Sequence, residues 1–469
     1  MFNKFLPGWI ILLLVAGLSC TPKPQPASLA SLMSRAEPLL IERRYTEAAT
    51  VLEEAAQTYP DRPEPLLKIG QIYLAQQRWL LAEDAFNRAL ARAPRQGPPL
   101  AGLAETLYYQ DRLREALDLW QEAAAITPSA PKVWTGLGRT YLALFDFEAA
   151  REAFLEQQHR QPDPEAQWYL AALTAPTDWA KAMAYLQAMP AEGELASRRD
   201  YLLATLEPFD KETPPTEVAK ATGIALAQAQ VWPLAIHALT VAQEQGSNDA
   251  ETLAFLGYAR TQVGWPAFDL FEQAQQADPE SALPLYFEGL YLRQQGALKA
   301  AEASFHQAVT LAPDNAAFYA EMAETKAQKG ELSTAEIWYQ AAVQVSEDDL
   351  RFRLLQAQFY ANWGYNMVEG GIPAAEAIIE TDKNNAEAYD LLGWMQFLTG
   401  VPEGGEAALR QALVLNPDLI SARYHLARQL EVSGRMTEAA AEYQRVVDWD
   451  TSGIFRDKAL IDLQRLKTE

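Results

Sequence analysis

The feature that most limits what this chain can fold into is a sequence pattern that returns every 34 residues. Two positions of the pattern show the period: a small residue at Gly70, Ala104 and Gly138, and a closing proline at Pro94, Pro128 and Pro162. A single closed core does not call for such a period, because its elements all meet different neighbours. A repeated unit presents the same faces to the next copy of itself, so we predict an open stack of similar units.

Each unit has the residue spacing of two helices joined by a short turn. In residues 63–96 the apolar and small residues of the first half recur at helical intervals, at Leu66, Ile69, Gly70 and Tyr73. The second half repeats this spacing at Ala82, Phe86 and Ala89. The closing proline ends the second helix, because it lacks an amide donor and clashes with the preceding turn. Such a hairpin cannot bury its apolar face alone, so stacking must supply the core.

These residues resemble the tetratricopeptide repeat (TPR). Unit 131–164 shows the family pattern most fully, with Trp134, Leu137, Gly138, Tyr141, Ala150, Phe154 and Pro162. Most of the pattern is also kept by units 29–62, 63–96, 97–130, 282–315, 316–349, 386–419 and 420–453. The resemblance implies an all-α protein, a right-handed superhelical solenoid of TPR helix hairpins.

The matches and the gaps between them divide the chain into six segments. They are a signal peptide at 1–19, a Pro-rich tether at 20–28, a block of four TPRs at 29–164, a degenerate repeat and joint at 165–215, a block of about seven TPRs at 216–453 and a capping helix at 454–469. Two interpretations of 165–215 stay open: a joint between two solenoid blocks, or one decayed repeat in a continuous superhelix.

The N-terminus has the features of a targeting segment. Lys4 supplies a short positive region, Trp9 to Leu18 is uncharged and apolar, and the chain's one cysteine, Cys20, follows directly. This arrangement resembles a bacterial lipoprotein signal, which implies lipidation of Cys20 and a lipid anchor on the extracytoplasmic side of a membrane. The alternatives are an ordinary secreted protein with a stray cysteine and an uncleaved anchor.

Composition and motifs exclude several classes of function. The formal net charge is −23, and no cluster of Lys and Arg is available to bind nucleic acid. The four histidines, at 159, 237, 306 and 425, stand far apart and outside any zinc-binding motif. No phosphate-binding loop, dinucleotide fingerprint or nucleophile elbow is present. We therefore expect no enzyme activity, no cofactor and no metal.

Binding is expected on the first helix of each unit, because in the TPR family that helix lines the concave groove. The family's groove positions correspond here to Tyr108, Tyr109, Arg139, Tyr258, Arg293, Trp394, Phe397, Tyr424 and Arg428. Aromatic residues and arginines are effective anchors for protein partners. Trp394 and Phe397 lie one turn apart and predict an apolar pocket beside Arg428. The set of Lys, Asn and Arg residues with which some TPR domains hold a C-terminal carboxylate is missing from 63–139.

Taken together, the sequence predicts a membrane-anchored TPR lipoprotein of the bacterial cell envelope that binds proteins or peptides in its groove, as a scaffold or assembly factor. The alternative is a glycan- or peptidoglycan-binding accessory module of an export or cell-wall system, since aromatic groove residues also stack on sugars.

Overall fold

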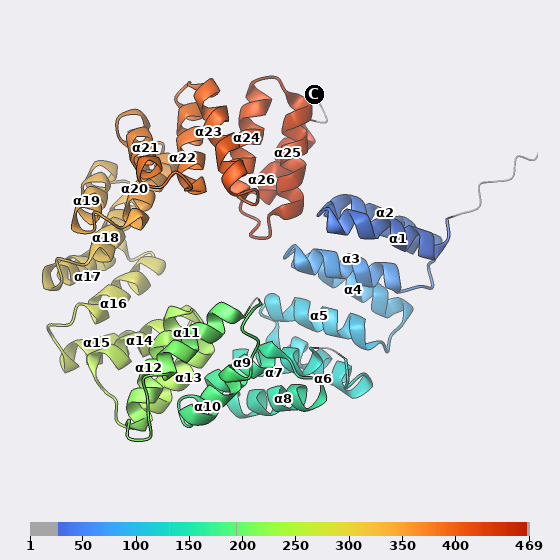
Figure 1. Cartoon of the computed structure of the whole chain (residues 1–469), viewed down its shortest axis with the longest axis horizontal. Helices are drawn as coiled ribbons and strands as arrows, with labels where there is room; N and C mark the ends of the chain where they lie inside the picture. Colours follow the sequence, from blue (N-terminus) through green and yellow to red (C-terminus); the bar gives the residue numbers. More distant parts are fainter. Residues whose placement is uncertain (1–26, 131, 194, 467–469) are drawn as a thin grey trace, which may run out of the picture.

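The computed structural model describes residues 27–130, 132–193 and 195–466, and all regular structure within these ranges is helical. The helices form antiparallel hairpins that stack side by side into a curved solenoid (Figure 1). This arrangement confirms the predicted all-α fold. The signal peptide, Cys20 and most of the Pro-rich tether lie outside the described residues.

The first four hairpins are α1 (Leu29–Ile41) with α2 (Tyr45–Thr58), α3 (Glu64–Ala75) with α4 (Trp79–Arg92), α5 (Gly97–Tyr109) with α6 (Leu113–Ile126), and α7 (Val133–Ala143) with α8 (Phe147–Arg160). The segment 165–215 contributes most of α9 (Pro164–Thr174), then α10 (Trp179–Gln187) and α11 (Ala196–Leu206), and the start of α12. Helices α9 and α10 pair as a hairpin, whereas α11 stands between hairpins and packs on both α10 and α12.

The second half begins with α12 (Pro215–Gln228) and α13 (Trp232–Glu244), α14 (Ala250–Gln262) and α15 (Phe268–Ala277), α16 (Leu283–Gln294) and α17 (Leu298–Leu311), and α18 (Ala316–Gln328) and α19 (Leu332–Val345). It continues with α20 (Leu350–Trp363), the short π-helix η1 (Met367–Gly371) and α21 (Ile372–Thr381), then α22 (Ala386–Leu398) and α23 (Pro402–Leu415), α24 (Ile420–Val432) and α25 (Met436–Trp449), and α26 (Arg456–Leu466).

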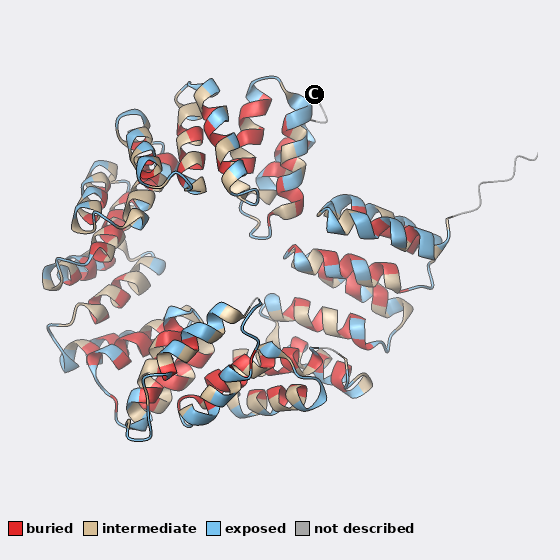
Figure 2. Cartoon of the chain, in the orientation of Figure 1, coloured by how far each residue is buried: buried red, intermediate tan, exposed pale blue. Residues whose placement is uncertain are grey.

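The recurring glycine and phenylalanine are explained by direct contact between helices. A Cβ atom on Gly70 would lie 2.5 Å from the ring of Phe86, and one on Gly102 of the following hairpin would also lie 2.5 Å from that ring. Phe86 is fully buried, so one ring fills the space between its own hairpin and the next. Figure 2 shows the result along the solenoid: buried residues run between neighbouring helices.

The turn inside most of the hairpins uses one residue in the left-handed region. Gln77 has φ 54°, and at the same position of later units Gly296 and Gly330 have φ 73° and 78°. Glycine adopts this conformation without the Cβ clash that other residues suffer there. The position therefore explains part of the glycine pattern that the sequence shows.

One buried apolar cluster crosses the segment 165–215. It runs from Leu142 in α7 through Trp168 and Leu202 to Phe287 in α16, without a break between the two halves. Helix α13 also packs back against α7 and α9. The ring of Phe145 lies 4.2 Å from that of Trp265, more than 100 residues further along the chain. The structure thus links the halves by packing as well as by chain connection.

The two ends of the solenoid lie against each other, a contact that the repeat pattern does not predict (Figure 1). We call this contact the seam; it comprises Arg43, Thr46, Gln76, Asp448, Trp449 and Arg456. The Asp448 carboxylate accepts hydrogen bonds from the Thr46 amide at 3.0 Å and the Thr46 hydroxyl at 2.5 Å. The indole of Trp449 donates to the Arg43 carbonyl at 3.2 Å. The stack is therefore closed on itself, because the small rotation from unit to unit accumulates along a solenoid.

Candidate functional site

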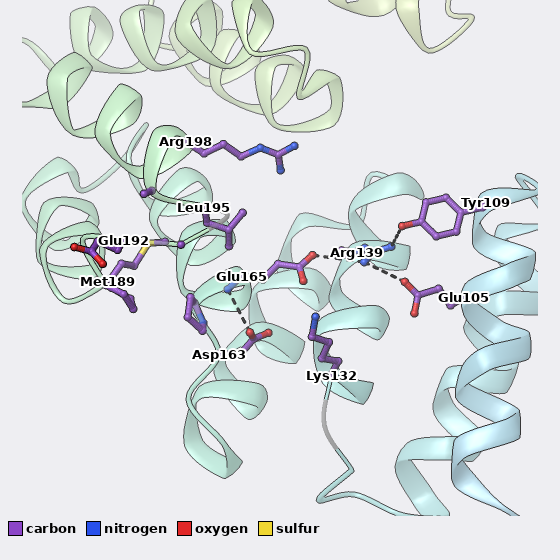
Figure 3. Close-up of a pocket in the computed structure, with 14 residues that line it drawn as sticks. Glu105, Tyr109, Lys132, Arg139, Asp163, Glu165, Met189, Glu192, Leu195 and Arg198 are labelled. Carbon is purple, nitrogen blue, oxygen red and sulfur yellow. Dashed lines mark hydrogen bonds and ion pairs between the residues drawn. The ribbon is translucent and has the colours of Figure 1, made fainter. Parts of the chain in front are cut away.

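A pocket of about 500 Å³ opens on the first helices α5, α7 and α9 and on the segment that joins α10 to α11 (Figure 3). The charged side chains that line it are Glu105, Lys132, Arg139, Asp163, Glu165, Glu192 and Arg198. Tyr109 from the end of α5 forms one wall, and Met189 and Leu195 lie on the opposite side.

Arg139 in α7 is the centre of the polar network on this surface. Its Nη1 atom lies 3.5 Å from a carboxylate oxygen of Glu105 and 3.5 Å from one of Glu165. Its Nη2 atom donates a hydrogen bond to the Tyr109 hydroxyl at 3.2 Å. The guanidinium also lies 4.9 Å from the centre of the Tyr108 ring. Only 16% of the Arg139 side chain is exposed, so these partners hold it in one position.

The repeat period explains why these groups come together. Glu105 and Arg139 are 34 residues apart, so they occupy the same position in the first helices of successive units, α5 and α7. Their side chains face each other where these two hairpins stack. Burial on its own would lower the pKa of the Arg139 guanidinium. The charge of Glu105 and the neighbouring tyrosines outweigh burial, and the pKa is raised above its ordinary value.

Tyr109 gives this network an exposed aromatic edge. Its ring stacks on that of Trp79 in α4 with 4.7 Å between centroids, and meets Tyr108 edge-on at 5.3 Å. The residue is nevertheless 46% exposed. An aromatic side chain that is both fixed and accessible loses little conformational entropy when a partner binds.

Two further cations line the pocket without a carboxylate partner among the described residues. Lys132 precedes α7, has φ 63° and is exposed. Arg198 in α11 lies with its guanidinium 5.8 Å from the Trp168 ring, and Figure 3 shows it extending across the pocket. Within the part of the chain that the structure describes, Arg139 is thus neutralised by acids, whereas Lys132 and Arg198 are not.

The structure brings together Tyr108, Tyr109 and Arg139 from the predicted groove residues, and places the other six elsewhere along the first helices. Tyr258 stacks on Phe287 with 4.4 Å between ring centroids. Arg293 pairs with the Glu321 carboxylate and donates to the Glu321 carbonyl at 3.2 Å. Both side chains are therefore held by the neighbouring unit.

Trp394 packs between two rings near the C-terminal end. It stacks on Phe397 at 5.5 Å and on His425 at 4.1 Å. His425 in turn lies 2.7 Å from a carboxylate oxygen of Asp390, measured from its Nδ1 atom. The ring that stacks on Trp394 from the next unit is thus a histidine.

Tyr424 and Arg428 are engaged by the last helix. The Tyr424 hydroxyl donates to Asp462 in α26 at 3.0 Å, and Arg428 lies 3.4 Å from the same carboxylate. Burial and the Asp462 charge raise the pKa of Tyr424 to about 12. Asp462 is buried although it is a polar residue of the terminal helix, because α26 turns it towards these two side chains.

Sequence reasoning missed Glu165, Trp168 and Arg198. All three follow Pro162, where the 34-residue register is lost, so no family position could be transferred to them. One sequence signal could have indicated a binding site here. Aromatic residues and the Arg198-Arg199 pair are concentrated in a segment that matches the repeat poorly.

Within the described ranges, no group of three or more His, Cys, Asp or Glu side chains is placed to hold a metal ion. Over the same part of the chain, no helix combines the length and the apolar character needed to cross a bilayer.

Two-helix units that stack in series, with polar and aromatic side chains on the surface of their first helices, define an α-solenoid repeat protein. Family models described as tetratricopeptide repeat match residues 39–107 and 292–359, and a second set described in the same way matches 102–164, 267–316 and 399–453. Together these ranges cover more than half of the chain, which therefore belongs to the tetratricopeptide-repeat family. No curated protein sequence matches it.

Among solved structures, yeast Tom70 is similar with a TM-score of 0.43 and 12% identity, over 94% of this chain and 96% of that one. Cut9 in the Cut9–Hcn1 hetero-tetramer of APC/C has a TM-score of 0.41 and 13% identity over 94% and 96%. YrrB, described as a TPR protein with an unusual peptide-binding site, has a TM-score of 0.31 and 16% identity over 41% of this chain and 98% of that one.

Proposed function

We propose that this chain is a protein-binding scaffold of the bacterial cell envelope, anchored to a membrane by lipid on Cys20, and that it holds a protein or peptide partner against the first helices around Arg139. Binding alone is the proposed activity; no covalent step is involved. TPR proteins typically act as scaffolds, and the repeats of this chain support that role.

The observation that carries the binding proposal is the network at Arg139. A fixed arginine, an accessible tyrosine and a pocket of about 500 Å³ lie together on first helices of three successive hairpins. Arginine and tyrosine are enriched among the residues that dominate protein interfaces, especially where they are already positioned. A partner that covers Tyr109 would gain a large apolar contact without having to order the protein first.

The anchor proposal is supported by the short distance in sequence between Cys20 and the first described helix. Ser28 caps the first helix by accepting a hydrogen bond from the Ser31 amide at 3.2 Å, and the Tyr59 hydroxyl donates to the Ala27 carbonyl at 2.9 Å. Only residues 21–26 separate this ordered start from Cys20. The acidic composition also favours attachment by acyl chains, because a net charge of −23 repels anionic lipid.

Binding is tested by site-specific crosslinking in cells. A photoreactive amino acid placed at Tyr109 should yield a discrete crosslinked protein, and the same probe at Phe268 serves as the control, since Phe268 has similar exposure but lies at the start of α15. Unlabelled Tyr109→Ala should weaken capture of that protein by about 1–3 kcal/mol, the range of a truncated anchor. Identical crosslinking patterns at the two positions would reject the site.

The anchor is tested separately by fractionation. Wild-type protein should incorporate a radiolabelled fatty acid and sediment with membranes, whereas Cys20→Ala should do neither. Membrane association of Cys20→Ala at the wild-type level would show that the lipid is not the anchor.

A further inference from the structure

Three hollows meet at Arg198 in α11. The first is the pocket that contains Arg139. The second has a volume of about 340 Å³ and lies between α9, α11 and α12, and the third has a volume of about 230 Å³ and lies between α7, α9 and the turn that joins α12 to α13. Arg198 lines all three, and Ala229 lines the second and third. Their chemistry differs.

The hollow between α9, α11 and α12 is apolar. Trp168, Tyr201, Leu202 and Leu226 line it, and Arg198 is the one charged residue in its lining. Trp168 is only 2% exposed, and its indole N–H has no acceptor among the described residues. A large apolar side chain entering from outside would therefore meet aromatic and aliphatic surface with a cation at the rim.

The smaller hollow carries positive charge without compensation from its own lining. Arg139 and Arg198 both line it, and no Asp or Glu does. The charge of Arg139 is offset by Glu105 and Glu165, which lie outside this hollow. Arg198 has no ion-pair partner among the described residues. An anionic group entering here would be attracted mainly by Arg198. This positive site contrasts with the overall charge of the protein, which is strongly negative.

We infer that the segment around α11 binds a stretch of a partner protein in which a large apolar side chain and an acidic side chain lie within two positions of each other. The apolar side chain enters the hollow lined by Trp168, and the carboxylate pairs with Arg198. In an extended peptide, side chains two positions apart project from the same face, so an apolar and an acidic side chain at that spacing can both turn towards the surface around Arg198. This inference rests on the proposed function and names the kind of segment that is bound.

Charge complementarity at the second and third hollows, whose linings contain arginine and no Asp or Glu, decides between this partner and others. A basic segment would be repelled by Arg198, and an uncharged apolar one would leave the guanidinium without a partner beneath the peptide, which is costly. The residues assigned to the apolar side chain and the carboxylate, Trp168 in α9, Leu226 in α12 and Arg198 in α11, lie outside 63–139, the range in which the carboxylate-holding set is missing. The site is therefore an additional one, next to the network at Arg139.

The test uses random linear peptides displayed with their C-termini fused to the phage coat, selected against the full-length protein in detergent. The fusion ensures that any carboxylate comes from Asp or Glu. Selected sequences are then synthesised as acetylated, amidated peptides, and their affinities are measured by fluorescence anisotropy. We expect an acidic residue within two positions of a large apolar one, and affinity that falls as salt is raised.

Variants then locate the contact. Arg198→Gln should weaken the selected peptides about tenfold, as expected for loss of one charge-assisted contact. Replacing the peptide's acid by its amide should have the same effect on wild type and little further effect on Arg198→Gln. Ser197→Trp should also weaken binding, because Ser197 lines the apolar hollow. Arg114→Gln is the matched control, since Arg114 is exposed on α6 without a partner among the described residues.

The outcomes separate the two proposals. Selected peptides that lack an acidic residue, or that bind Arg198→Gln as tightly as wild type, would overturn this inference and leave the proposed scaffold function standing. Failure to select any peptide, together with no crosslinked partner at Tyr109, would overturn both. Arg198 is exposed and has no ion-pair partner among the described residues, so Arg198→Gln should fold normally, and an unchanged circular dichroism melt verifies this.

Discussion

Replacing Asp448 with alanine is expected to part the two ends of the solenoid. Asp448 lies in α25 at the seam, is only 5% exposed and accepts two hydrogen bonds from Thr46 in α2. The Asp448→Ala variant leaves the Thr46 amide and hydroxyl without this acceptor. The other seam contacts, through Trp449, Gln76 and Arg456, would remain, and Arg43 would still pair with Asp418, but the interface would be smaller.

The size of the effect follows from these two bonds. A hydrogen bond to a charged acceptor contributes about 1.5–3 kcal/mol. Burial raises the pKa of Asp448, which shows that part of this gain offsets the cost of removing the carboxylate from water. We therefore expect a net loss of about 2–3 kcal/mol in the closure of the seam, which corresponds to a shift of roughly 30- to 150-fold towards the open form.

The distance between the ends can be measured by double electron–electron resonance. Cys20 is the chain's one cysteine, so Cys20→Ser provides a background for spin labels. Thr50→Cys and Gln464→Cys place the labels on opposite sides of a hollow at the seam, one on α2 and one on α26. Wild type should give one short distance, and Asp448→Ala should add a population at longer distances.

Asp118→Ala is the matched control, because Asp118 is exposed on α6 and remote from the seam. Amide exchange in α2 provides a second readout, since its protection should fall only when the ends separate. If Asp448→Ala keeps both the short distance and the protection of α2, the hydrogen bonds to Thr46 do not hold the ends together and the reasoning is wrong.

Three further predictions concern the hairpins themselves. Phe86→Ala should cost about 3–5 kcal/mol of unfolding free energy in urea, whereas Leu80→Ala on the same helix, 78% exposed, should change it by less than about 0.5 kcal/mol; equal effects would contradict the packing role of the ring. Gly330→Val should cost about 1–2 kcal/mol because the position has φ 78°, and an unchanged melting temperature would argue against that strain. Burial alone would raise the pKa of Asp249, but its hydrogen bonds, the largest from Lys220, hold it well below the ordinary value. The resulting stability is therefore present above about pH 4 and lost as the pH falls below it. The Asp249→Asn variant should lose this acid dependence in urea titrations at several pH values, and an unaltered pH profile would refute it.

Much of the fold was predictable because a TPR hairpin is specified locally. The contact between Gly70 and Phe86 joins residues 16 positions apart, and the turn between them needs one left-handed residue. The residues of a single unit therefore specify its hairpin. The positions of Tyr108, Tyr109 and Arg139 follow from the same register. Whether the predicted groove residues bind a partner remains a prediction.

The segment after Pro162 shows where this reasoning stops. Glu165 and Arg198 reach the pocket from α9 and α11, where the repeat register no longer applies and helix packing alone sets the position. Likewise, Asp462 is a polar residue on a terminal helix, and nothing local indicates that it turns inward to meet Tyr424.

The sequence by itself determined the class of fold and the faces on which the regular hairpins stack, since these depend on interactions within one unit and with the next. Only the tertiary structure decided that Arg43 and Thr46 meet Asp448 and Trp449, about 400 residues away. The physical reason is that closure depends on the sum of many small rotations between units. No single unit encodes that sum, and an error of a few degrees in each would leave the ends apart.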